Sequence, residues 1–147
     1  MNTPTLVARW AGEHRFDTGR ADGPMSRLDG SGETGQSPVD GMLSALAACS
    51  GIDVVDILGK RRTPVQRLEV ETSAVRRDTP PRRVLSVRLT YRIDGEGIEA
   101  VHAERAVALA FEKYCSVAAT FKADVDVETV VVVNGAEGAP VKQAIPA

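Results

Sequence analysis

The sequence predicts an α+β fold in which strands stand at both ends of the chain and helices lie between them. An apolar stretch with the signals of a helix start covers residues 37–59, and stretches of alternating apolar and polar residues lie on both sides of it. Helical faces repeat every 3.6 residues and strand faces every two, so the two patterns mark different elements. A chain of 147 residues has the length of one domain. We place that domain at residues 1–134 and expect the Gly-, Ala- and Pro-containing residues 135–147 to be a disordered tail.

The N-terminal part of the chain predicts a β-hairpin followed by a long polar loop. Residues 6–10 alternate in polarity, Gly12-Glu13 offers a turn, and residues 14–16 supply the returning strand. Residues 17–36 are rich in Gly, Asp and Ser, with one short strand expected near residues 25–28. A polar loop of this length in a compact domain is usually functional or mobile.

The apolar stretch has clear helix boundaries. Ser37-Pro38-Val39-Asp40 provides a hydroxyl N-cap, a proline at the first helical position and an acid at the third. The helix should end near Gly59, because Lys60-Arg61-Arg62 suit its negative end and Pro64 forbids continuation. Apolar residues cover nearly all of its circumference, so we expect it to be buried on most sides, as a central core helix or at an oligomer interface.

The rest of the chain predicts a two-stranded meander with one solvated face, two helical segments and a last strand. In chain order these are residues 68–74 and 85–93, joined by a turn at 78–81, then 98–114, 116–121 and 125–133.

Composition and charge argue against several classes of partner. The formal net charge is −2 and acids and bases are interleaved, so there is no electrostatic reason to expect nucleic acid. The N-terminus has no charged region leading into an apolar one, so no targeting signal is expected. No apolar run approaches the roughly 20 residues that span a bilayer, so we expect no membrane contact and a cytoplasmic protein. In that compartment a pair of thiols is more often redox-active than a structural bridge.

Two cysteines, Cys49 and Cys115, are the main chemical feature, and each lies in an apolar helical stretch. If the fold brings them together, they make one thiol pair that can cycle through a disulfide. The thiolate is the nucleophile toward a peroxide, and a free cysteine is only a few per cent ionised at neutral pH. Cys49 lies too far from either helix end for the helix dipole to help, so a cation must approach it. Asp53 and Asp56 fall on the same helical face, and Asp53 either orients an arginine beside the sulfur or is a buried structural carboxylate.

No metal or cofactor is expected. His14 and His102 stand far apart in sequence and lack partners at ligand spacing. The chain has no Gly-rich phosphate loop and no Ser-His-Asp spacing, so a nucleotide or flavin has no support.

Two segments also resemble a known family. The segment SPVDGMLSALAACSGIDVVDIL resembles the first cysteine helix of the OsmC/Ohr family, and AFEKYCSV is similar to its second cysteine segment. The resemblance covers residues 37–133 and implies an intertwined homodimer, with antiparallel sheets wrapped around long central helices and two active sites at the interface. It also implies a thiol peroxidase that reduces organic hydroperoxides, with Cys49 as the attacking cysteine and Cys115 as the resolving one.

The chain departs from the family pattern at several positions. Ser116-Val117 follows the second cysteine where the Ohr branch has Pro-Tyr-Ser, which makes this segment more similar to the OsmC-like branch. The catalytic arginine of the family corresponds best to Arg20 in the run Gly19-Arg20-Ala21-Asp22-Gly23, with Arg15 and Arg27 as rivals.

The family's acid near the start of the cysteine helix is Asp40 here, rather than glutamate. Asp40 lies about 13.5 Å from Cys49 along an ideal helix and roughly 180° around it, so it cannot touch the cysteine of its own chain. It serves either the cysteine of the partner chain, directly or through a bridging arginine, or only the helix cap.

We expect Cys49 to attack the terminal oxygen of a hydroperoxide, release an alcohol and become a sulfenic acid. Cys115 then closes a disulfide, which an external dithiol reduces. Apolar walls would favour alkyl or lipid hydroperoxides over hydrogen peroxide, and the residues expected to form them are Met42, Ala45, Leu46 and Phe111.

Two other functions stay open. A hot-dog-like thioesterase with Asp40 as general base would need neither cysteine. A non-catalytic dimer that binds a small apolar ligand would use both cysteines as core residues. Because the long helix is apolar on all faces, we expect an obligate homodimer that buries well over about 2,000 Å².

Overall fold

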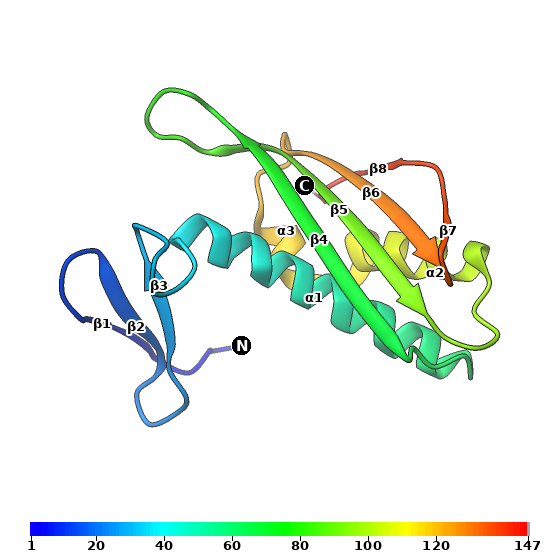
Figure 1. Ribbon diagram of the computed structural model, residues 1–147, viewed down its shortest axis with the longest axis horizontal. Coiled ribbons are helices and arrows are strands. Elements are labelled where there is room, and N and C mark those ends of the chain that lie inside the picture. Colours follow the sequence, from blue (N-terminus) through cyan, green and yellow to red (C-terminus); the bar gives the residue numbers. More distant parts are fainter. Residues whose placement is uncertain (147) are drawn as a thin grey trace. The chain divides into compact units, whose positions relative to one another are not determined.

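The computed structural model describes residues 1–146 and has the expected α+β composition (Figure 1). The chain forms two compact units, one from Met1 to Ser44 and one from Ala45 onward, where the sequence predicts one domain over residues 1–134. The boundary falls inside the long helix α1 (Pro38–Lys60). Each unit is therefore described by itself.

The first unit is a three-stranded antiparallel sheet in the order β1 (Leu6–Trp10), β2 (Arg15–Arg20) and β3 (Ser26–Asp29). The predicted hairpin is confirmed, and Gly12 and Glu13 have positive φ angles of 94° and 50° at its turn. β2 is longer than predicted, because all five residues of β1 pair with it, from Leu6 opposite Arg20 to Trp10 opposite Phe16.

Asp29 orders the loop after β3. This carboxylate is 1% exposed and accepts hydrogen bonds from the main-chain N–H and the hydroxyl of both Ser31 and Thr34, at 2.7–3.0 Å. The hydroxyl donors, followed by the two main-chain donors, hold the pKa of Asp29 well below its ordinary value. Much of the stretch expected to be a polar loop is thus strand or a hydrogen-bonded turn.

The start of α1 agrees with the prediction, since the Asp40 N–H donates to the Ser37 hydroxyl at 3.1 Å. The part of α1 in the second unit buries one stripe, Leu46, Ser50, Gly51, Val54 and Leu58. Its opposite side exposes Ile52 (61%) and Val55 (43%). The single chain therefore does not bury this helix on most sides, and its burial at an oligomer interface stays a prediction.

By length and composition alone α1 could cross a membrane, with a mean hydropathy of 1.6 in its most apolar window. The prediction that no apolar run approaches this length is wrong. The signal is a weak one, because apolar core helices of globular proteins also satisfy it. Here the buried stripe of α1 packs on a sheet: a Cβ on Gly51 would lie 3.6 Å from Leu68 and 3.8 Å from Val70.

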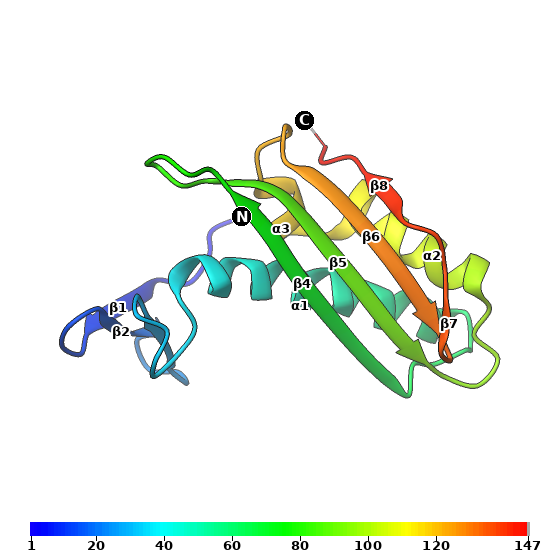
Figure 2. The same cartoon turned by 45° about the horizontal axis from the view of Figure 1, so that its top comes forward.

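The sheet of the second unit is mixed rather than purely antiparallel as predicted. β4 (Arg67–Arg76) pairs antiparallel with β5 (Val84–Asp94), and β6 (Asp126–Val133) pairs parallel with β5. The parallel pairing arises because the helical segments between β5 and β6 return the chain across one face of the sheet. Figures 1 and 2 show α2 (Ala100–Leu109) on the same face as the part of α1 from Ala45 onward.

The C-terminal residues differ from the prediction as well. β7 (Ala136–Glu137) and β8 (Val141–Gln143) both pair antiparallel with β6, so the expected disorder is wrong for residues 136–143. The turn before β7 is Asn134-Gly135, whose φ angles of 48° and 85° are those a two-residue hairpin turn requires.

The second predicted helix is not continuous. α2 ends at Leu109, and the chain then forms a π-helical turn, η1 (Ala110–Tyr114). Cys115 then takes an extended conformation with ψ of 102° before the short helix α3 (Ser116–Thr120). π-helical turns occur frequently at functional sites, so this interruption draws attention to Cys115.

Candidate active site

The fold brings Cys49 and Cys115 together within the second unit. Both are free cysteines, Cys49 half-buried on α1 and Cys115 buried between η1 and α3. The Cys49 side chain neighbours the Cys115 thiol and raises its pKa. The two form the thiol pair that the sequence analysis required.

Local backbone structure explains why Cys115 points into the core. The π-helical turn places the Cys115 N–H against the Ala110 carbonyl at 2.8 Å, five residues back. The Cys115 sulfur then caps α3 by accepting the Ala118 N–H at 3.4 Å, and the side chain is 3% exposed. A regular α-helix through this segment would rotate Cys115 to a different direction.

The environment keeps Cys115 in its thiol form. Burial, followed by the neighbouring Cys49 and by Asp53, raises the pKa of Cys115 from 9.0 to about 11, with the Ala118 N–H acting in the opposite direction. A protonated, buried thiol is a poor nucleophile. Of the two cysteines, the half-buried Cys49 is therefore the better placed to react first with a peroxide.

A buried polar pair that sequence reasoning missed lies close to the thiols. Ser50 donates to the Leu46 carbonyl at 2.8 Å, and its oxygen lies 2.7 Å from the Tyr91 hydroxyl. Both Ser50 and Tyr91 are fully buried, and burial raises the pKa of Tyr91 well above its ordinary value. Only an alternating strand pattern marks Tyr91 in the sequence, and nothing in that pattern signals its partner.

Asp53 lies one helical turn after Cys49, at the wall of a cavity of about 350 Å³. Burial, then the nearby Asp56, raises the pKa of Asp53. Its Oδ2 atom is buried and has no hydrogen-bond partner within the second unit, and pairing of Asp53 with an arginine of the first unit stays a prediction. The cavity is lined by Asp53, Asp56, Ile57, Lys60, Arg61, Leu109 and Tyr114.

The residues predicted to form apolar walls occupy different surroundings. Leu46 and Phe111 are only 1% and 2% exposed, so they are part of the core of the second unit. Ala45 is exposed on α1 and Met42 belongs to the first unit. Contact of these four side chains with a substrate stays a prediction.

Arg20 and Asp40 also belong to the first unit, and their approach to the thiols stays a prediction. Among the three candidate arginines, Arg27 forms a bidentate ion pair with Asp17, in which Nε donates to Oδ1 at 2.6 Å and Nη2 donates to Oδ2 at 3.1 Å. Arg15 lies 3.8 Å from Glu13. Arg20 is exposed at the end of β2 and makes no ion pair within the first unit. Its charge is the one left uncommitted.

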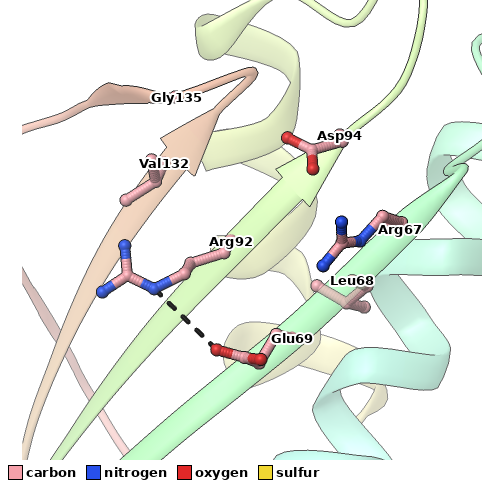
Figure 3. Close-up of a pocket in the computed structure, with 7 residues that line it drawn as sticks. All are labelled: Arg67, Leu68, Glu69, Arg92, Asp94, Val132 and Gly135. Carbon is pink, nitrogen blue, oxygen red and sulfur yellow. Dashed lines mark ion pairs between the residues drawn. The ribbon is translucent and has the colours of Figure 1, made fainter.

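Two further cavities, like the one beside Asp53, have no cysteine among their lining residues. One of about 390 Å³ lies between α2 and strands β6 and β8. The other, of about 550 Å³, lies over the ends of β4, β5 and β6, where Arg92 and Glu69 are 4.0 Å apart (Figure 3). Residues 1–146 contain no cluster of three or more His, Cys, Asp or Glu side chains placed to hold a metal ion. The thiol pair is the reactive centre that these observations single out.

Comparison with known proteins places the chain among OsmC-like sequences. Residues 30–130 match the family described as OsmC-like protein. Protein YhfA of Escherichia coli strain K12 is 38% identical over 111 residues, which cover 75% of this chain and 83% of YhfA.

Solved structures have the same fold. A hypothetical protein from Aquifex aeolicus has a TM-score of 0.82 and 28% identity, covering 91% of this chain and 98% of that one. The organic hydroperoxide resistance protein OhrB of Bacillus subtilis has a TM-score of 0.59 and 20% identity, covering 88% and 98%. At the latter identity the similarity shows the fold alone.

Proposed function

The chain belongs to the OsmC-like protein family, and from that premise we propose that it is a cysteine-based peroxidase that reduces organic hydroperoxides. The observation that carries the proposal is the pairing of two free thiols in unlike surroundings, Cys49 half-buried and Cys115 buried and held protonated. Members with the same fold include proteins described as organic hydroperoxide resistance proteins. We place the protein in the cytoplasm, where dithiol reductants are available.

In this mechanism the Cys49 thiolate attacks the terminal oxygen of ROOH. The O–O bond breaks, the sulfur becomes a sulfenic acid and RO⁻ leaves as the alcohol after gaining a proton. Cys115 then displaces the sulfenic hydroxyl as water and forms the Cys49–Cys115 disulfide. An external dithiol restores both thiols by exchange.

Activation of Cys49 requires a positive charge, and Arg20 is the side chain we assign to it. The guanidinium of Arg20 is exposed at the end of β2 and forms no ion pair within the first unit. Asp40 would orient that guanidinium. Arg20→Met should slow alkylation of Cys49 at neutral pH by tenfold or more, because about one pKa unit corresponds to 1.4 kcal/mol. Arg27→Met, which removes an arginine already paired with Asp17, is the matched control.

The exposed side of α1 supports a homodimer. Ala45, Ala48, Ile52, Val55 and Gly59 lie on this side at spacings of three and four residues and form a seam of the kind that packs against a second helix. We propose that the seam packs against a second copy of the chain, in a dimer that buries well over about 2,000 Å².

Ile52→Glu should shift the protein from dimer to monomer in light scattering at micromolar concentration, because it places a charge in the seam. Val101→Glu is the matched control, since Val101 is equally exposed (63% against 61% for Ile52) but lies on α2. A wild-type protein that is a stable folded monomer would contradict the dimer.

The proposed peroxidase is tested with single cysteine variants and tert-butyl hydroperoxide. Cys49→Ser should lose peroxide reduction, whereas Cys115→Ser should complete one turnover and stop as the sulfenic acid. If Cys49→Ser stayed reactive while Cys115→Ser formed no sulfenate, the roles would be reversed. Acyl thioester hydrolysis unaffected by either change would favour the thioesterase. A folded wild-type dimer with neither peroxide reduction nor thioester hydrolysis would favour the non-catalytic dimer.

A further inference from the structure

We propose that Asp53 is the proton relay of the thiol site, giving a proton to the departing alkoxide and then accepting one from Cys115. The inference rests on the proposed peroxidase function. It starts from position: Asp53 follows Cys49 by one turn of α1, and the cavity whose wall it forms is also lined by Tyr114, the residue before Cys115. Asp53 therefore lies beside both cysteines, and its charge acts on Cys115.

The bonding of Asp53 separates it from a structural carboxylate. Buried carboxylates that serve structure are satisfied by hydrogen bonds, as Asp29 is by four donors from Ser31 and Thr34. Asp53 has a buried Oδ2 atom with no hydrogen-bond partner within the second unit. An atom in that state is free to exchange a proton with a substrate or a neighbouring thiol.

The groups around Asp53 favour its protonated form. Burial is the main cause of its raised pKa and the charge of Asp56 adds to it. Lys60 and Arg61 line the same cavity, and neither forms an ion pair with Asp53. The groups near it from other elements are Tyr91, Tyr114 and Cys115, which are neutral when protonated. A carboxyl group whose pKa is raised keeps its proton to higher pH than an ordinary aspartate does, which suits it to donate a proton.

The first proton transfer accompanies peroxide cleavage. As the Cys49 thiolate takes the terminal oxygen of ROOH, the O–O electron pair remains on RO⁻, a strongly basic leaving group. The Asp53 carboxylic acid protonates it, so ROH departs and Asp53 becomes a carboxylate. General acids of this kind contribute about 10²–10⁴ to the rate when the leaving group is poor.

The second transfer accompanies disulfide closure. Cys115 is held as a thiol, so it needs a base before it can attack. The Asp53 carboxylate left by the first step accepts the Cys115 proton. The Cys115 thiolate then attacks the sulfur of the Cys49 sulfenic acid, and the hydroxyl leaves as water with the proton that Asp53 returns. Asp53 regains a proton from solvent through the cavity, which balances the one that Cys49 lost when it became a thiolate.

The test measures how the rate of sulfenic acid formation at Cys49 depends on the leaving group of the peroxide. The Cys115→Ser background is used because the reaction then stops after the first step, and the sulfenic acid is trapped in a stopped-flow experiment. Asp53→Asn preserves shape and removes the acid. It should slow the reaction with tert-butyl hydroperoxide at least tenfold. It should slow the reaction with 3-chloroperoxybenzoic acid less than threefold, because that leaving group is a weakly basic carboxylate. Asp53→Glu should restore part of the alkyl hydroperoxide rate.

Asp56→Asn is the matched control on the same helical face. It should keep the tert-butyl hydroperoxide rate within threefold at pH 6 and move the alkaline fall of the profile to lower pH, because removing its negative charge favours ionisation of Asp53. Equal slowing of both peroxides by Asp53→Asn, or no slowing of either, would overturn the relay while leaving the peroxidase in place. A wild-type protein that reacts with neither peroxide would overturn both proposals.

Discussion

Alkylation of Cys115 by iodoacetamide should be far slower in the folded, reduced protein than in the same protein unfolded in urea. Its pKa rises from 9.0 to about 11 on folding. A shift of about two units lowers the thiolate fraction near neutral pH about 100-fold, so the alkylation rate should fall by about that factor or more, since the side chain is also 3% exposed.

The assay is mass spectrometry of the Cys115 peptide after timed alkylation from pH 6 to pH 11, with the protein kept reduced by a phosphine. The rate in the folded state should still be rising at pH 10, where the unfolded control has levelled off. Cys49→Ser should bring the pKa of Cys115 closer to 9 but not down to it, because burial, the larger cause, remains. Equal rates in the folded and unfolded states near neutral pH would refute this account of the site.

The same shift makes the stability of the fold depend on pH. Between about pH 9 and pH 11 the folded state binds the Cys115 proton more tightly than the unfolded state does. Its contribution to the unfolding free energy is therefore complete below pH 9 and is lost as the pH rises toward 11. The loss is about 2–3 kcal/mol, since each pKa unit corresponds to 1.4 kcal/mol. Cys115→Ser should remove this part of the pH dependence in urea titrations, while the part due to the buried Tyr91 remains.

Three substitutions test the packing around the site. Tyr91→Phe should lower the unfolding free energy by only about 1 kcal/mol in urea titrations, because Ser50 keeps its hydrogen bond to the Leu46 carbonyl. Ser50→Ala should lower it more, by about 1–3 kcal/mol, because it leaves the buried Tyr91 hydroxyl without a partner. The opposite ranking would contradict the hydrogen-bond pattern. Leu58→Ala should cost about 2–5 kcal/mol by the same measurement, since Leu58 is 0% exposed, and a cost below 1 kcal/mol would place it outside the core. Asp29→Asn should destabilise the first unit at neutral pH but not in strong acid, because the lowered pKa of Asp29 stabilises the fold only while its carboxylate is ionised. Amide exchange of the Thr34 N–H followed by NMR would measure the loss of stability. Equal protection of this amide in both proteins at pH 7 would refute the prediction.

Local signals made much of the fold predictable. Gly12-Glu13 marked the first hairpin, and Ser37-Pro38 marked the start of α1, because these residues determine backbone conformation within a few positions. The turn at Asn134-Gly135 carries an equally local signal, and treating it as the start of a disordered tail overlooked it. The α+β class and the family followed from such features.

Features that depend on contacts between distant segments were not predictable. The parallel pairing of β5 with β6 and the π-helical turn before Cys115 depend on how the chain between those strands packs on the sheet. The Ser50–Tyr91 bond joins residues 41 positions apart. For the candidate site, the two cysteines and the segments around them suggested the thiol pair, but the unpartnered oxygen of Asp53 could be found only in the structure.

The position of the two cysteines in the chain links redox state to durability. Cys49 lies on α1 and Cys115 follows η1, so a bond between them would close a ring containing β4, β5 and α2. A ring of about 65 residues restricts the unfolded chain enough to be worth about 4 kcal/mol in the chain-entropy model. The oxidised form would then melt at a higher temperature and resist proteolysis longer than the reduced form. A cell that exhausts its reductant would accumulate the protein in the disulfide form, which is inactive but more stable. Restored reductant would return it to the dithiol form, which is active and more easily degraded.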